Sequence, residues 1–420
     1  MVRRSLLPLV VLCLLATIVS CQKGADRECD SFFPSCPLGL ECDLGTYQCV
    51  DMGCGECSAD KPVCEPVTKL CVQCVGTGPQ DACGSQLCDK NVCKACVEDV
   101  DCPDGLCLRN GSCPKAADIA FATAAGTANA ECSRTTPCTL PAALATGRPY
   151  LHVRGNHTVP ATLQITRTVR IYGPLDGTRP KISVSAAGPV FEVSGNVTLD
   201  LRDVELTGAT GAEGHGILVR SGAPTLDLET VDIIGNAGLG ISAGGAALKL
   251  TFGLVVGNAG GGISAAGRVE LENNIIAGNG STASAVGGVR LTSSGTSSVV
   301  RFNTIAANLA TAGVGSGVAC AAAQQLSSNI FAGNTMTTCT AIYSLFPVGT
   351  TVPGTGNKAG DPQFLGTTLP ANRDDETYYH LAATSPAAAS GEPLPSSQVI
   401  SDIDGDGRIA NREIGADELR

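Results

Sequence analysis

The chain contains no tryptophan, and only 4% of its 420 residues are aromatic. A compact globule of this length normally fills its core with larger side chains. A repetitive architecture needs only small and β-branched ones, because each repeat contacts just its neighbours. Basic residues are also scarce: the formal net charge is −11, and no basic patch is present. We therefore expect a repeat protein with no nucleic acid and no anionic membrane surface as a direct partner.

Long apolar runs are missing except at the N-terminus, where Leu6 to Val19 follow Arg3 and Arg4. That length suits a signal peptide and is short for a transmembrane helix. The run ends in Ile18-Val19-Ser20-Cys21, which resembles a bacterial lipoprotein box, in which the cysteine is lipidated and becomes the mature N-terminus. The alternative is an ordinary secretory signal.

The lipoprotein interpretation makes residues 1–20 a signal peptide and residues 21–28 a tether lipidated at Cys21. The membrane is then a partner through a lipid anchor, because no other segment of the sequence is suited to span it. Gln22 follows the cysteine where an aspartate would direct retention, by resemblance to envelope sorting rules. We therefore expect a location in the bacterial cell envelope, at the outer membrane or cell surface.

Sixteen cysteines fall between Cys29 and Cys113, in four successive groups of four. An even count in an exported chain indicates a disulfide framework, because such short segments cannot build an adequate hydrophobic core. We therefore expect residues 29–113 to form a spacer with eight disulfides, whose connectivity the sequence leaves open. The alternative is zinc, since Cys54-x2-Cys57 and Cys71-x2-Cys74 are spaced almost as in a zinc ribbon.

The stretch from Val197 to Asn334 repeats itself. Thr198-Leu199-Asp200-Leu201 returns 27 residues later as Thr225-Leu226-Asp227-Leu228. Each unit ends in an asparagine, at successive spacings of 22, 21, 29 and 26 residues. These are Asn236, Asn258, Asn279, Asn308 and Asn334. A large apolar residue stands three positions before each, and a further asparagine stands five positions before the last three.

Self-similarity at this period indicates a solenoid, and the alternation of apolar residues, as in Leu226 and Leu228, indicates strands. Coils stacked about 4.8 Å apart place equivalent residues in columns. We therefore predict an all-β parallel β-helix whose asparagine amides bond along the stack. We also expect these asparagines to adopt the left-handed backbone of a turn. A β-sandwich is the alternative, but it gives no reason to maintain asparagine in register.

Two cysteine pairs lie outside the spacer. Cys132-x5-Cys138 precedes Thr139 to Ala145, an arrangement that resembles the start of bacterial pectin-lyase-like β-helix proteins. The resemblance implies a right-handed β-helix, with a helical cap in residues 114–149 and coils over residues 150–360. Cys320 and Cys339 are nineteen residues apart, close to one coil, so they are also disulfide candidates. Two buried thiols are the alternative for that pair.

The C-terminal segment, residues 361–420, has several short motifs. They are, in order, Asp361-Pro362-Gln363-Phe364, Tyr379-His380-Leu381, Ser385-Pro386, Gly391, Asp402-x-Asp404-Gly405, Arg408 and Ile414-Gly415-Ala416-Asp417-Glu418. They resemble the C-terminus of bacterial choice-of-anchor Q domain proteins, which have the pectin-lyase-like β-helix fold. The resemblance covers about residues 130–420 and implies a surface location and a cap at residues 361–420. It departs from the family at Asp417, where an aromatic residue is usual, and it implies little about activity.

Residues 402–413 of this segment fit the twelve-residue EF-hand loop at every coordinating position. Asp402, Asp404 and Asp406 would supply side-chain oxygens, Arg408 its carbonyl oxygen, and Glu413 a bidentate carboxylate. Four carboxylates brought this close repel one another unless a cation lies between them. We therefore expect calcium as a structural cofactor, with a metal-free cap on the final coil as the alternative.

Outward positions of successive units are also charged. Asp200, Asp227, Lys249 and Glu270 each stand nine residues before a ladder position. This column could bind a cation or a sugar, although the solvated face of any β-helix has similar residues. Gly214-His215-Gly216 matches one short polygalacturonase motif, but the aspartate-bearing motifs of that family are absent nearby. We interpret His215 as a turn residue.

These features together predict a monomeric, surface-anchored lipoprotein with a non-catalytic β-helix. The β-helix would act as a display or binding scaffold for an extracellular glycan or a surface protein. The alternative is a polysaccharide lyase or glycoside hydrolase of the pectin-lyase-like fold. Such enzymes need paired carboxylates, or a calcium-binding carboxylate cluster with an arginine or lysine base, and the sequence shows no such set in register.

Overall fold

The structure is a computed structural model. It describes residues 40–43, 48–51, 57–65, 70–79, 81–128, 131–293, 298–351, 353–369, 377–393, 401–408 and 412–419. The predicted lipidation residue Cys21 and the cysteines Cys29, Cys36 and Cys54 lie outside these ranges. The chain divides into two compact units, Met1–Pro114 and Lys115–Arg420. Within the described ranges, no helix is both long and apolar enough to cross a membrane.

The described part of the N-terminal unit consists of short antiparallel hairpins and 3-10 turns. Its elements are β1 (Leu40–Asp43), β2 (Gln48–Asp51), β3 (Val63–Cys64), β4 (Cys71–Val72), β5 (Gly78–Pro79), η1 (Asp81–Cys83), β6 (Leu87–Asp89), β7 (Val92–Lys94) and η2 (Asp99–Asp101). Cysteines take the place of an apolar core here, since Cys74, Cys83 and Cys88 form a buried cluster with Cys93 against it. Covalent links therefore supply the stability that burial alone would not.

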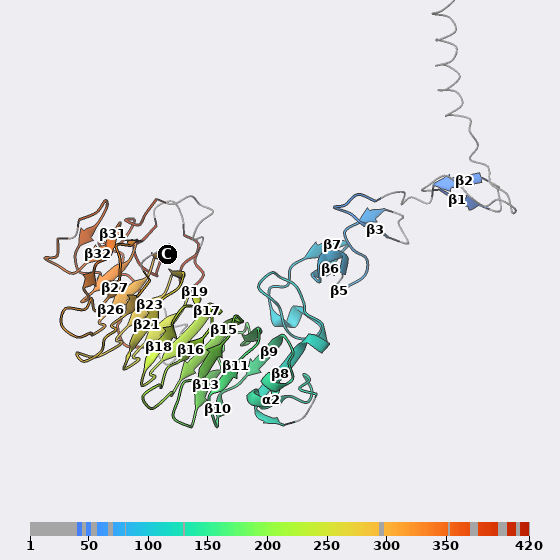
Figure 1. Ribbon diagram of the computed structural model, residues 1–420. Helices are drawn as coiled ribbons and strands as arrows, with labels where there is room; N and C mark the ends of the chain where they lie inside the picture. Colours follow the sequence, from blue (N-terminus) through green and yellow to red (C-terminus); the bar gives the residue numbers. More distant parts are fainter. Residues whose placement is uncertain are drawn as a thin grey trace, which may run out of the picture. The chain divides into compact units, whose positions relative to one another are not determined.

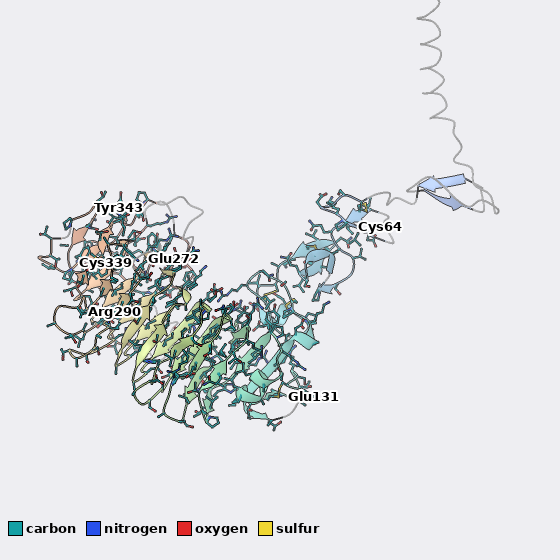
Figure 2. The ribbon with its side chains drawn as sticks, in the orientation of Figure 1. Cys64, Glu131, Glu272, Arg290, Cys339 and Tyr343 are labelled. Carbon is teal, nitrogen blue, oxygen red and sulfur yellow. A yellow bond between two sulfur atoms is a disulfide. The ribbon has the colours of Figure 1, made fainter. Side chains whose placement is uncertain are left out.

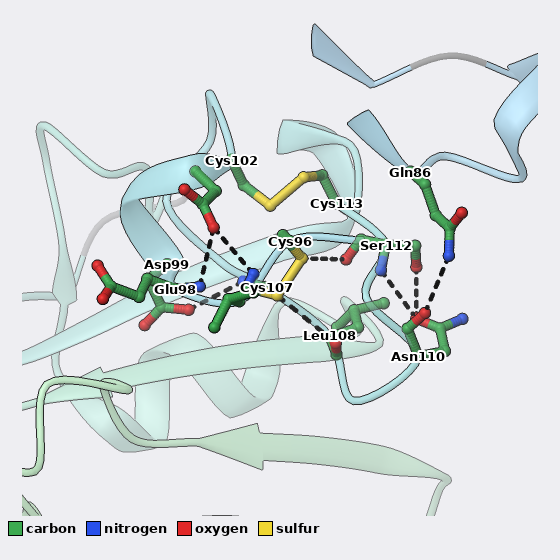
Figure 3. The surroundings of a disulfide bond; sticks show 12 residues. Gln86, Cys96, Glu98, Asp99, Cys102, Cys107, Leu108, Asn110, Ser112 and Cys113 are labelled. Carbon is green, nitrogen blue, oxygen red and sulfur yellow. Dashed lines mark hydrogen bonds between the residues drawn. A yellow bond between two sulfur atoms is a disulfide. The ribbon is translucent and has the colours of Figure 1, made fainter. Parts of the chain in front are cut away.

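Five disulfides are described in this unit. They are Cys57–Cys71, Cys74–Cys88, Cys83–Cys93, Cys96–Cys107 and Cys102–Cys113. In each of the last two groups of four cysteines, the first pairs with the third and the second with the fourth, so the two links interlock. Figure 3 shows the last group, with Cys96–Cys107 and Cys102–Cys113. Closing loops of this size contributes about 3 kcal/mol each in the chain-entropy account. The disulfide prediction is confirmed for these residues, and Cys71 and Cys74 are not zinc ligands.

The second unit, Lys115–Arg420, forms a parallel β-helix of two sheets (Figure 1). In the middle coils, the chain contributes two strands, or one long bent strand, to the larger sheet and one strand to the smaller. The larger, 18-stranded sheet contains β8 (Ile119–Thr127), β9 (Tyr150–Arg154), β10 (His157–Val159), β12 (Val169–Tyr172), β13 (Lys181–Val184), β15 (Thr198–Thr207), β17 (Thr225–Ile234), β19 (Ala247–Thr251), β20 (Leu254–Val256), β22 (Val269–Glu272), β23 (Ile275–Ala277), β25 (Val299–Arg301), β26 (Thr304–Ala306), β28 (Gln325–Ser327), β29 (Ile330–Ala332), β31 (Thr340–Ile342), β32 (Leu345–Phe346) and β33 (Lys358–Ala359). The smaller, 8-stranded sheet contains β11 (Leu163–Ile165), β14 (Phe191–Ser194), β16 (Ile217–Ser221), β18 (Leu239–Ala243), β21 (Gly261–Ala265), β24 (Val289–Leu291), β27 (Val318–Cys320) and β30 (Met336–Thr337). The predicted fold class is confirmed.

The core of the β-helix is a set of apolar columns. The residues three positions before the ladder asparagines stack in register between consecutive coils and are fully buried, as predicted. They are Ile233, Val255, Ile276, Ile305 and Phe331. Phe331 also stacks on Phe346 of the next coil, with ring centroids 4.9 Å apart. Each coil thus buries its apolar face against its neighbours, which explains how the chain folds with so few aromatics.

The asparagines form two ladders inside the β-helix. Asn258 is typical: its Nδ2 donates to Asn279 Oδ1 at 2.9 Å and to the carbonyl of Ile233 at 2.9 Å. One ladder runs through Asn236, Asn258, Asn279, Asn308 and Asn334. The other runs through Asn274, Asn303 and Asn329 and is continued by Ser344 Oγ, which accepts the N–H of Asn329. The predicted bonding along the stack is confirmed.

The backbone expectation for these asparagines is wrong by one residue. The left-handed conformation belongs to the residue just before each ladder asparagine, such as Gly235 (φ 66°), Gly257 (φ 65°) and Gly278 (φ 62°). Phe302 and Ser328 take the same conformation, at φ 53° each, before Asn303 and Asn329. The asparagine must point its amide inward to reach the next coil, so the turn is made by the residue before it.

A short helix, α2 (Leu140–Ala145), lies at the first coils of the β-helix, after the 3-10 turn η3 (Ala116–Asp118). It follows the Cys132–Cys138 disulfide, and its Leu140 and Ala143 are buried in the same apolar cluster as the coils. Arg167 Nη2 donates to the carbonyl of Leu144 at 2.8 Å, so a cation satisfies the C-terminal end of the helix. Both predicted cysteine pairs of this unit are disulfides, since Cys320 is bonded to Cys339.

The described residues of the C-terminal segment, 361–369, 377–393, 401–408 and 412–419, lie along the side of the later coils. The outward side chains of Leu254, Val256 and Ile275 are apolar, and Tyr379 and Ala416 of the C-terminal segment pack on them. The segment is bonded to coils far away in sequence: Asn273 Nδ2 donates to the carbonyl of Ser401, and Ala416 N–H donates to Thr304 Oγ1. We call residues 401–419 of this segment the strap.

Candidate functional site

The predicted surface column is present in the larger sheet. Asp200, Asp227, Lys249 and Glu270 are direct neighbours in the parallel register of β15, β17, β19 and β22. A second outward column runs beside it. It consists of Arg202, Glu229, Thr251, Glu272 and Arg301. Successive members of the first column are 27, 22 and 21 residues apart in sequence, and the repeat places them side by side, as predicted.

The charges of these columns pair with one another. Lys249 Nζ lies 3.5 Å from Glu270, and Arg301 contacts Glu272, which is labelled in Figure 2. Asp200 is only 7% exposed, and its Oδ2 accepts a hydrogen bond from the Tyr172 hydroxyl at 2.7 Å. Self-paired and partly buried carboxylates have little left to offer a sugar or a cation, so the column has the properties of a structural surface.

Arg202, in the second column, also contacts Tyr172, the partner of Asp200. Its guanidinium lies 4.6 Å from the centre of the Tyr172 ring, and its Nε lies 3.2 Å from Asp203. The loop between β12 and β13 adds Arg179, which donates to the carbonyl of Thr230 at 3.3 Å and lies 3.8 Å from Asp232. Residues of three successive coils are thereby tied together on the outer face of the sheet.

His215 has a structural partner. Its Nδ1 accepts the backbone N–H of Leu239, in the next coil, at 2.8 Å. Burial lowers the pKa of His215, which favours the neutral ring that this hydrogen bond requires. A Cβ at Gly238 would lie 2.5 Å from the same nitrogen, so the glycine is needed for the close approach. These contacts agree with the interpretation of His215 as a turn residue.

The C-terminal loop starts with a buried carboxylate. Asp402 is fully buried, and its Oδ1 accepts the N–H groups of Asp404 at 3.0 Å and Asp406 at 2.8 Å. Its Oδ2 accepts the N–H of Glu418 at 2.9 Å. Burial raises the pKa of Asp402, while these three donors act in the opposite direction. Asp402 thus holds a turn and attaches it to the last residues of the strap.

The other predicted ligands separate into two groups. Asp404 and Asp406 line a hollow of about 150 Å³ together with His380, Asp417 and Glu418. His380 Nε2 lies 3.3 Å from Asp404, and its Nδ1 lies 3.6 Å from Asp417. One ligand atom from each of His380, Asp404 and Asp417 falls within a sphere suited to a metal ion. Burial raises the pKa of Asp417 to about 6.

Glu413 lies outside that hollow. Burial, together with the neighbouring carboxyl group of Glu418, raises the pKa of Glu413 to about 8. Arg408 also contacts Glu418: its Nη1 lies 2.8 Å from Glu418 Oε2. Its Nη2 donates to Asn273 Oδ1 at 3.0 Å. The Arg408 guanidinium also covers the ring of Phe302 at 4.6 Å, which fixes the strap to the β-helix.

His380 and Asp417 were missed as ligand candidates from the sequence, although both stand in the C-terminal motifs. The EF-hand pattern covers only residues close in sequence, whereas these two reach the loop from other segments. Residues 409–411 of the predicted loop lie outside the described residues. Calcium binding by residues 402–413 remains a prediction.

Comparisons with known proteins found one family model and a similar solved structure. A family model described as right handed beta helix region matches residues 191–355. No curated protein matches the chain. Among solved structures, the chain is similar to the crystal structure of pectate lyase Pel9A, with a TM-score of 0.47 and 16% sequence identity over 72% of this chain and 96% of that chain. The protein is a right-handed parallel β-helix with a disulfide-rich N-terminal region.

Proposed function

We propose that the protein is a surface-anchored, monomeric lipoprotein whose β-helix is a non-catalytic scaffold for display and binding. The single observation that supports this most is the internal pairing of the outer charged columns. Asp200 accepts from Tyr172, Lys249 pairs with Glu270, and His215 accepts from a backbone N–H. Side chains committed to such contacts stabilise a surface and are poorly placed to abstract or donate protons to a substrate.

The N-terminal region suits the role of a stalk. Interlocked disulfides restrict the unfolded chain and hold short hairpins that would not be stable by burial alone. A lipid on Cys21 in the outer membrane would fix one end of this stalk and leave the β-helix outside the lipid. An extracellular glycan or a surface protein is the proposed partner.

The proposal includes a structural cation in the C-terminal segment. The described geometry favours Asp404, Asp406 and Asp417 with His380 as the groups nearest to it, because these line one hollow. Asp402 would orient the loop, and Arg408 and Glu413 would hold the strap. Calcium accepts carboxylate oxygens readily, and a weak site suits an extracellular module.

The experiment that tests the proposed function is a glycan array combined with two turnover assays on the same glycans. One assay measures new reducing ends and the other measures unsaturated uronates. We expect binding to at least one glycan class without turnover. Turnover that disappears in Asp227→Asn or His215→Gln would overturn the proposal in favour of the lyase or hydrolase alternative.

A further inference from the structure

The smaller sheet has a groove on its outer face over β24, β27 and β30. Arg290, Ala319 and Thr337 are neighbours in register and form its floor. The groove is also lined by Ala285, Thr292, Thr311, Gly313, Val314 and Ala321. The hollow measures about 560 Å³. That volume lies within the range of small-molecule sites, which runs from about 300 to 1,000 Å³.

Arg290 is the charged residue of this groove. Its side chain is exposed and makes no hydrogen bond or ion pair with any residue in the described ranges. Its neighbours along the column are Ser264 and Ala319, and no acidic residue lines the groove. The sequence has no charged residue from Phe302 to Asn357, which includes the coil that follows. No neighbouring carboxylate therefore competes with a ligand for this guanidinium.

Arg220 on the same sheet shows the contrast. It lies 2.9 Å from Glu192 and 2.8 Å from Glu213, so its charge is already neutralised. Arg290 has no such carboxylates, although the chain as a whole has an excess of acidic residues. The groove at Arg290 is therefore a place where an acidic chain presents an uncompensated guanidinium.

The chemistry of the lining selects the ligand class. A guanidinium binds a carboxylate through two parallel N–H donors, and the geometry is specific. Thr292, Thr311 and Thr337 also line the groove. The hydroxyls of Thr292 and Thr311 donate to the carbonyls of Ala265 and Ser284, so they would accept hydrogen bonds from the hydroxyls of a sugar. No aromatic ring lines the groove, so stacking cannot select a neutral sugar, and the charge must dominate recognition.

We infer that this groove binds an acidic saccharide through the carboxylate of one sugar unit, held by Arg290. The inference rests on the proposed binding function and names its ligand class. Neighbouring sugars would extend along the column, past the outward Ser264 and Ser242 of the preceding coils. Binding would weaken with added salt, because one exposed ion pair carries the recognition.

The test is calorimetric titration of the full protein with three oligosaccharides of equal length. They are a galacturonate trimer, a galactose trimer and a sulfated galactose trimer. We expect the galacturonate trimer to bind at least tenfold more tightly than the galactose trimer. Arg290→Gln should reduce its affinity at least tenfold, and Arg290→Lys should reduce it less, because the charge remains while the paired donors are lost.

Arg268→Gln is the matched control, since Arg268 is an exposed arginine outside the groove and its side chain likewise has no partner among the described residues. It should leave the affinity unchanged, and circular dichroism should show all variants folded. Equal binding of the galactose trimer, equal or tighter binding of the sulfated trimer, or wild-type affinity in Arg290→Gln would each overturn the carboxylate site. If saccharides bind independently of Arg290, the proposed function stands and the site is wrong. If no glycan on the array binds either, the glycan-binding form of the proposed function fails with it.

Discussion

Asn258 and Asn279, which are 21 residues apart in sequence, form a hydrogen-bonded pair in the interior of the β-helix. Asn279 Oδ1 accepts both the backbone N–H of Asn258, at 3.0 Å, and its side-chain Nδ2, at 2.9 Å. Both residues are completely buried. Each amide in the column therefore satisfies backbone and side-chain groups of a neighbouring coil, and the spacing between coils is fixed by polar contacts as well as by the apolar columns.

Removing one asparagine from the ladder should destabilise the protein. In Asn279→Ala, the N–H and amide of Asn258 and the carbonyl of Val255 lose their partner without gaining water. We expect the free energy of unfolding to fall by about 3 kcal/mol or more. Denaturant titration measures it. Thr282→Ala, at an exposed position three residues on, should change it by about 0.5 kcal/mol or less. Similar effects of the two substitutions would contradict the ladder as a source of stability.

Acidification should destabilise the β-helix through His215. Burial places its folded pKa below the ordinary value of 6.5. As the pH falls below that value, the unfolded chain takes up a proton that the folded chain resists, so stability declines with falling pH. We expect the wild type to lose more stability between about pH 7.5 and pH 5 than His215→Gln does. The pKa of His157 is also lowered by burial, but that residue is present in both proteins. Parallel pH profiles would show that His215 does not contribute.

Calcium should raise the unfolding temperature of the protein, because a cation that binds only the folded state stabilises it by mass action. Asp404→Asn and Asp417→Asn should reduce or abolish this shift, since both carboxylates face the hollow beside His380. Glu392→Gln, in the same segment but not lining the hollow, is the control. Asp402→Ala should lower stability even without calcium, because three N–H donors lose their acceptor. No shift at millimolar calcium would remove the cation from the proposal.

Membrane anchoring should depend on Cys21. Cys21→Ala should move the protein from the membrane fraction to the soluble fraction, because the residue that receives the lipid is gone. Cys13→Ala is a suitable control, since Cys13 lies inside the preceding apolar run. Fractionation followed by immunoblotting gives the readout. Retention of the Cys21→Ala protein in membranes would place the anchor elsewhere.

The coils were predictable because residues at short, regular spacings in the sequence determine their register. The interval between successive asparagines and the apolar residue three positions earlier together define which side chain faces inward. The left-handed positions belong to the residues before the asparagines, because each asparagine must point its amide inward, a requirement that residue type alone does not reveal. Gly235, Gly257 and Gly278 were visible in the sequence just before the asparagines.

The site was less predictable, because its partners come from separate segments. The EF-hand pattern indicated an acidic loop at residues 402–413, and the described part of this loop folds tightly around Asp402. The pattern could not show that Glu413 lies outside the hollow, or that His380 and Asp417 reach it. Likewise, the charged column was visible as a row, but its pairing with Tyr172 and Arg170 depends on side chains of an earlier coil.

The position of the strap has a consequence for synthesis and export. Arg408 bonds to Asn273, 135 residues earlier, and Ile403 and Ala416 cover the outward Leu254, Val256 and Ile275. A growing or translocating chain can stack its coils one after another, but part of this apolar strip stays uncovered until the strap has emerged. Nascent chains stalled before residue 401 would thus expose apolar surface that can bind other nascent chains and chaperones. Emergence of the strap is then the event that covers the rest of this strip.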